Sequence, residues 1–82
     1  MTIVTDRLIA IFGWYGTAAV VAAYFLVSFN VLRPTDLIYQ LLNATGAFGI
    51  VIVSLKKKTY QPGVLNIIWT VIALVAIINI LL

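Results

Sequence analysis

Residues 59–82 read TYQPGVLNIIWTVIALVAIINILL, and no side chain in this stretch carries a charge. Two more charge-free stretches precede it, at residues 8–32 and 37–55. A helix needs about 20 mostly apolar residues to cross the roughly 30 Å hydrocarbon core of a bilayer, and each stretch reaches or nearly reaches that length. The sequence therefore predicts an all-α integral membrane protein with three spans.

The composition agrees with this prediction. The chain is 65% hydrophobic and 9% charged, with a mean hydropathy of +1.22, far from the balance of a soluble domain. Its 82 residues allow one bundle, so residues 1–82 are predicted to form a single transmembrane domain. We expect helices at about residues 8–32, 36–55 and 62–81, with Thr35 or Asp36 capping the second one. Transmembrane strands would need polar and apolar residues in alternation and a closed barrel, which this chain does not offer.

The few charged residues predict the orientation in the membrane. Arg7 and the triplet Lys56, Lys57 and Lys58 fall on one side of a three-span topology, and Arg33 falls on the other. The positive-inside tendency then places the N-terminus and the 56–62 loop in the cytoplasm and the C-terminus outside, on the far side of the cell's inner (cytoplasmic) membrane. The triplet is interpreted as a topology anchor that also contacts lipid headgroups, so the net charge of +3 does not call for nucleic acid.

Several kinds of chemistry are missing from the composition. The chain has no cysteine and no histidine, which removes thiolate and imidazole ligands, nucleophiles and bases. No acidic residue lies inside a predicted span, so coupling of transport to protons or sodium is disfavoured. We therefore expect no metal, no cofactor and no enzymatic activity.

Uncharged polar and small residues recur at helical spacing inside the spans. They form three stripes, which are Gly13, Thr17, Tyr24 and Ser28; Tyr39, Asn43, Gly46 and Ile50; and Asn66, Thr70, Ala73 and Ile77. One interpretation is helix packing, in which Gly13, Thr17, Gly46 and Gly49 allow close approach and amides bond across the interface. The other is a polar substrate pocket formed by Tyr39, Asn43, Asn66 and Trp69. Spacing alone favours packing.

Three segments carry a resemblance to a known family. They are Gly13-Trp14-Tyr15-Gly16, residues 37–47 (LIYQLLNATGA) and residues 60–69 (YQPGVLNIIW). In these segments the chain resembles a family of small bacterial three-span membrane proteins that carry uncharacterised or permease-like labels. The resemblance covers nearly the whole chain and implies a membrane bundle without implying an activity.

A looser similarity in architecture runs to the PQ-loop half-transporters. Those proteins pair two three-helix units into a parallel homodimer, with a path between them lined by Asn and Trp. The similarity implies that Asn66 and Trp69 would line such a path. The Pro-Gln pair typical of that family is absent, because Gln61-Pro62 stands in the reverse order and in a loop.

Two hypotheses for function follow. Three helices that fill their own centre leave no path for a solute, so a transport role needs at least two copies. The leading hypothesis is a homodimeric permease or facilitator for a small uncharged or zwitterionic solute, surrounded by membrane lipid. The alternative is a structural or regulatory subunit that packs against an unidentified partner in a larger membrane complex.

Overall fold

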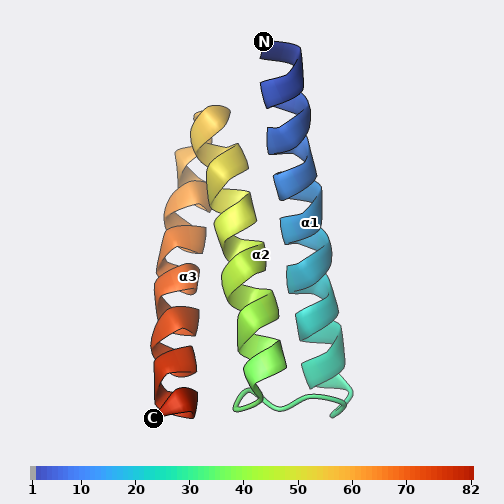
Figure 1. The fold of residues 1–82 in the computed structure, drawn as a ribbon, viewed down its shortest axis with the longest axis vertical. Helices are drawn as coiled ribbons and strands as arrows, with labels where there is room; N and C mark the ends of the chain where they lie inside the picture. Colours follow the sequence, from blue (N-terminus) through green and yellow to red (C-terminus); the bar gives the residue numbers. More distant parts are fainter. Residues whose placement is uncertain (1) are drawn as a thin grey trace.

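The computed structural model describes residues 2–82, which form three α-helices: α1 (Thr2–Ser28), α2 (Leu37–Lys56) and α3 (Tyr60–Leu81) (Figure 1). Each helix is long and apolar enough to cross a membrane. Successive helices run in opposite directions and are joined by short loops. The predicted all-α, three-span fold is confirmed, and the protein is a multi-pass membrane protein.

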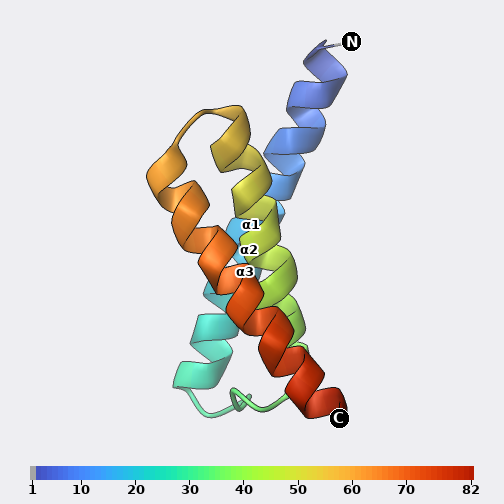
Figure 2. The same cartoon turned by 90° about the vertical axis from the view of Figure 1, so that its left-hand side faces the viewer.

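The second helix lies between the other two. Both α1 and α3 pack against α2, whereas no Cα atom of the described part of α1 lies within 8 Å of a Cα atom of α3. Figure 2 shows α1 and α3 inclined in opposite directions on the two sides of α2. The expected centre shared by all three helices is therefore wrong, and the core consists of two separate interfaces along α2.

The first helix ends four residues before its predicted boundary at Leu32 because the backbone turns left-handed there. Asn30 has a φ of 63°. This lets the Val31 N–H donate to the Leu26 carbonyl at 2.9 Å and the Asn30 N–H donate to the Val27 carbonyl at 3.2 Å. Such a pair of bonds satisfies carbonyls that a helix end leaves free, and Asn tolerates the left-handed conformation better than most residues.

The turn between α2 and α3 repeats the same device. Lys58 has a φ of 59°, and its N–H donates to the Leu55 carbonyl at 3.2 Å. The Thr59 N–H donates to the Ser54 carbonyl at 2.9 Å. The next helix begins two residues before its predicted boundary, and Pro62 falls in its first turn, where a missing N–H costs little.

The loop between α1 and α2 is held by its own side chains. Asp36 precedes α2 as expected for a cap, but its carboxylate accepts the Arg33 N–H at 2.8 Å instead of an N–H from the helix. The Gln40 side chain donates to the Pro34 carbonyl at 2.7 Å. The expected capping bond is therefore wrong, because the carboxylate closes the loop and not the first turn.

Candidate functional site

The interface between α1 and α2 brings the two backbones into contact through glycines. A Cβ atom placed on Gly49 would lie 2.5 Å from the Phe12 carbonyl oxygen, and one placed on Gly16 would overlap the Gly46 carbonyl oxygen. No larger residue fits at these positions without moving backbone atoms. Small residues allow this kind of approach between membrane helices.

The face that α1 turns toward α2 differs from the stripe expected from sequence. Gly13 does lie at the interface, where an added Cβ would meet the Val53 side chain at 2.5 Å. Thr17 is exposed, and Tyr24 is 71% exposed. The buried residues of α1 lie on a neighbouring face and are all small: Gly16, Ala19 and Ala23.

The interface between α2 and α3 is made by side chains. Ala47 on α2 and Ala73 on α3 are completely buried. A Cβ atom on Gly63 would lie 3.3 Å from the Ser54 Cβ atom, a distance that a small shift of the serine would relieve. The less exposed residues of α3 follow the predicted stripe, with Asn66, Thr70, Ala73 and Ile77 three or four positions apart.

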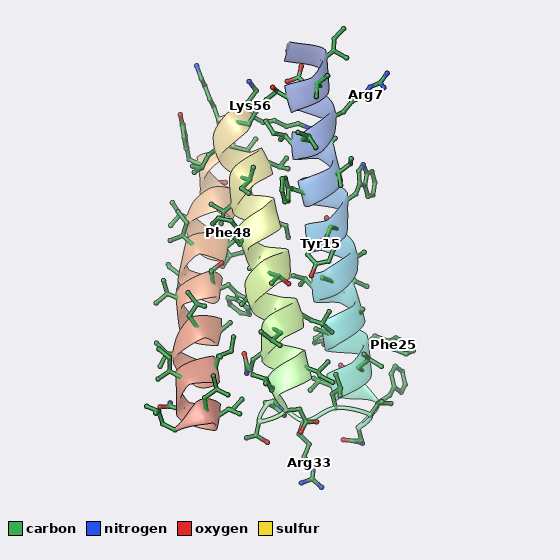
Figure 3. All side chains as sticks on the ribbon, in the orientation of Figure 1. Arg7, Tyr15, Phe25, Arg33, Phe48 and Lys56 are labelled. Atoms are coloured by element: carbon green, nitrogen blue, oxygen red, sulfur yellow. The ribbon has the colours of Figure 1, made fainter. Side chains whose placement is uncertain are left out.

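One side-chain hydrogen bond joins two helices among the described residues. The Tyr15 hydroxyl lies 2.6 Å from Oγ1 of Thr45. Because Thr45 already donates its hydrogen to the Leu41 carbonyl at 2.7 Å, Tyr15 is the donor of this bond. Figure 3 shows Tyr15 between α1 and α2. The bond reinforces the interface that the glycines already close.

Asn66 is satisfied within its own helix. Its Nδ2 donates to the Pro62 carbonyl at 2.9 Å, and its backbone carbonyl accepts the Thr70 hydroxyl at 2.7 Å. Local bonds of this kind let a polar side chain lie in an apolar segment without a partner from another helix. Trp69, one turn further along, is 48% exposed.

Asn43 differs from the other polar residues of the spans. It is only 8% exposed, and no described residue forms a hydrogen bond with its side chain. Any polar side-chain atom that is fully enclosed within the described residues has a hydrogen-bond partner. The carboxamide atoms of Asn43 have no such partner, so they must retain some accessible surface. Tyr39, one turn before it, is half-buried and also has no hydrogen bond within the described chain. These two side chains leave polar atoms available to another molecule.

The four predicted substrate residues lie at two levels of the molecule. Gly63 packs against Ser54, and α2 and α3 run in opposite directions from that point. Asn66 is three residues beyond Gly63 and Asn43 is eleven residues before Ser54, so a rise of 1.5 Å per residue separates the two amides by about 12 Å along the helices. The structure therefore brings Tyr39 near Asn43 and Asn66 near Trp69, but does not gather all four.

The charged residues lie at the two ends of the molecule. Arg7 and Lys56 are at one end, here called the lysine end, together with Lys57 and Lys58, and Arg33 is at the other (Figure 3). This is the distribution on which the predicted orientation depends. Among the described residues, no group of His, Cys, Asp and Glu could hold a metal ion.

Comparison with known proteins gives one match. Residues 9–82 match the model of a protein family. No curated protein and no solved structure matches the chain. The comparisons thus add no support for the similarity to PQ-loop half-transporters or for a permease label.

Proposed function

We propose a transport role for this chain, which belongs to the uncharacterised bacterial family whose model covers residues 9–82. In this proposal it is a homodimeric permease or facilitator in the inner membrane, through which a small uncharged or zwitterionic solute moves down its gradient. The observation that carries the proposal is Asn43, a carboxamide nine-tenths buried in a span and without a partner in the described chain. An unsatisfied amide in a membrane helix is costly, and polar groups kept at such positions mark solute paths.

The available polar groups fit an uncharged solute. Asn43 offers two N–H donors and one acceptor, and Tyr39 adds a hydroxyl that can donate or accept. About 12 Å toward the lysine end, Asn66 and Trp69 offer a second amide and an aromatic face. Asp6, the one acidic residue of the three helices, stands near the start of α1 at the lysine end, and residues 8–32, 37–55 and 59–82 contain none. No acidic group is therefore available inside the membrane to couple the solute to protons or sodium. Downhill movement is the mode of transport that remains.

A single copy of the protein offers no continuous solute path past Asn43. Gly46 and Ala47, the next residues along α2 toward the lysine end on the same side, are buried by α1 and α3. A continuous path therefore has to run between two copies. A two-fold axis is the simplest way to relate them, and the separation of α1 from α3 leaves part of α2 open to a second copy. We propose that the lysine end is cytoplasmic.

The test is solute flux into liposomes that contain the purified protein. Glycerol, urea and glycine serve as probes of uncharged and zwitterionic solutes. We expect the wild type to pass at least one of them and Asn43→Leu to lower that flux at least tenfold. Asn79→Leu is the matched control, because Asn79 is exposed near the end of α3. Asn43→Leu should fold as well as the wild type, since the described structure gives its amide no partner to lose.

Two results would contradict the proposal. The first is a wild type that leaves liposomes tight to all three probes. The second is an equal loss of flux in Asn43→Leu and Asn79→Leu, which would show that the buried amide has no special part. Cross-linking in the membrane tests the dimer separately, because a facilitator of this kind should yield homodimers.

A second candidate function is supported by α3. It is the most apolar of the three spans, with a mean hydropathy of 2.6 over its most apolar 18 residues, and only its Gly63 and Ala73 are buried. Such a helix has a wide surface for a structural or regulatory contact with a larger membrane complex. A photo-reactive residue in place of the exposed Ile68 would then capture a non-identical protein. Capture of lipid and identical copies alone would argue against this candidate.

A further inference from the structure

A half-open groove of about 460 Å³ runs between α1 and α2 at the lysine end. Asp6, Lys56 and Lys57 contribute to its lining, and small residues of α1, among them Ala10 and Gly13, lie deeper in it. None of the four proposed substrate residues lines this groove. Any ligand that binds here is therefore separate from the proposed solute path.

The groove has the depth of one membrane leaflet. Its lining runs on α1 from Asp6 to Thr17, which are eleven residues apart. At 1.5 Å per residue this is about 16 Å, close to half of the roughly 30 Å hydrocarbon core. The charged residues stand at the membrane surface, and Thr17 lies near the middle of the bilayer. A groove with these proportions matches an acyl chain of one leaflet.

The charges near the surface have no partner within the part of the chain that the structure describes. Within residues 2–82, Lys56, Lys57 and Asp6 form no ion pair with one another or with another residue. Two ammonium groups and one carboxylate are thus left facing the same groove. Their natural complement is a headgroup that combines a phosphate with an amine. A purely anionic headgroup would gain from the lysines but would be repelled by Asp6.

We propose that the groove binds one phospholipid of the phosphatidylethanolamine class from the leaflet at the lysine end. Its phosphate accepts hydrogen bonds from Lys56 and Lys57, and its ammonium group donates to Asp6. One acyl chain lies along Ala10 and Gly13, between the larger side chains of Ile9 and Trp14 that also line the groove from α1. The lipid then contacts α1 and α2 together, beside their shared interface.

The test measures lipid binding to the full-length protein by native mass spectrometry. The protein in detergent is titrated with phosphatidylethanolamine, phosphatidylglycerol and phosphatidylcholine that carry the same acyl chains. We expect the ethanolamine lipid to bind most tightly. Lys56→Gln or Lys57→Gln should weaken its binding about five-fold each and about thirty-fold together, the effect expected for losing one surface charge contact per lysine. Asp6→Asn should shift the preference toward phosphatidylglycerol.

Two matched controls separate a built site from general attraction to charge. Lys58→Gln removes the same charge next to the groove but outside its lining, and it should leave binding unchanged. Ala10→Phe fills the groove and should abolish binding, whereas Ala18→Phe places the same ring on an exposed position of α1 outside the lining and should not.

Three outcomes would overturn the proposal. Equal losses of lipid affinity in Lys58→Gln and Lys56→Gln would show that the lysines act only through general attraction to charge. A wild type that prefers phosphatidylglycerol would show that Asp6 does not select a headgroup with an ammonium group. Undiminished binding to Ala10→Phe would place the lipid elsewhere. The readout is lipid affinity, so it does not depend on whether the protein transports a solute.

Discussion

The two sides of α2 are built differently. Toward α1, glycines bring backbone against backbone, and the bond from Tyr15 to Thr45 crosses the interface. Toward α3, alanine and serine side chains form the contact, and no bond between side chains crosses it among the described residues. The comparison teaches that α1 and α2 form a fixed pair, whereas α3 is held by contacts that small side-chain movements can adjust.

This difference bears on how a membrane protein of this size could change shape. Packed helices slide past one another by small amounts when only side chains interlock. Backbone contact leaves no such freedom, because carbonyl groups cannot rotate away. If the proposed solute path opens and closes, α3 is the helix that moves relative to the pair formed by α1 and α2.

The largest effect is expected from adding one methyl group to each interface. Gly49→Ala should lower the free energy of unfolding by about 3 kcal/mol, because its Cβ would meet the Phe12 carbonyl oxygen at 2.5 Å and backbone would have to shift. Gly63→Ala should be neutral or stabilising by up to about 1 kcal/mol, since the Ser54 side chain can give way and alanine favours helix. Unfolding by sodium dodecyl sulfate in mixed micelles measures both. Equal losses in the two variants would show that the two interfaces are alike.

A smaller effect, of opposite sign, is expected at the turn that joins α2 to α3. Lys58 is left-handed with a φ of 59°, a conformation that costs most residues roughly 1–2 kcal/mol and costs glycine little. Lys58→Gly should therefore raise the unfolding free energy by about 1 kcal/mol, less than the full strain because glycine also loosens the unfolded chain. Asn30→Gly, at the corresponding place after α1, is the control and should change stability less. A loss of stability in Lys58→Gly would mean that the lysine side chain outweighs the strain.

The smallest effect concerns the bond that only the α1 side possesses. Tyr15→Phe should lower the unfolding free energy by about 0.6 kcal/mol, the usual size of a side-chain hydrogen bond between membrane helices. Tyr24→Phe is the matched control, because Tyr24 is exposed and has no hydrogen bond within the described chain. A double-mutant cycle with Thr45→Ala isolates the bond. Strict additivity in that cycle would show that the two hydroxyls do not interact.

The number and nature of the helices could be predicted from sequence because charge marks where each span stops. The polar stripes that helical spacing predicts on α2 and α3 also lie on the faces that pack. The face of α1 that packs does not follow from the sequence, because residues 8–32 are apolar all around the helix and give no amphipathic signal for its rotation. The predicted stripe contains the polar residues Thr17 and Tyr24, whereas the small residues Gly16, Ala19 and Ala23 form the contact.

The sequence likewise predicts one part of the candidate site and not the other. Tyr39 and Asn43 lie four residues apart, so their shared face follows from helical periodicity alone. Their distance from Asn66 depends on the register between α2 and α3, which the contact of Gly63 with Ser54 sets. Whether a side-chain amide forms a hydrogen bond depends on the backbone carbonyls within its reach. Asn66 reaches that of Pro62, whereas Asn43 reaches none in the described chain.

The position of α2 between its two neighbours has a consequence for biosynthesis. Every helix pair that packs is also consecutive in the chain, so each contact joins segments separated by one short connection. Topologies with such local contacts assemble quickly. The hairpin of α1 and α2 can pack while the ribosome still holds α3. The α3 helix then packs against the side of α2 that α1 leaves open.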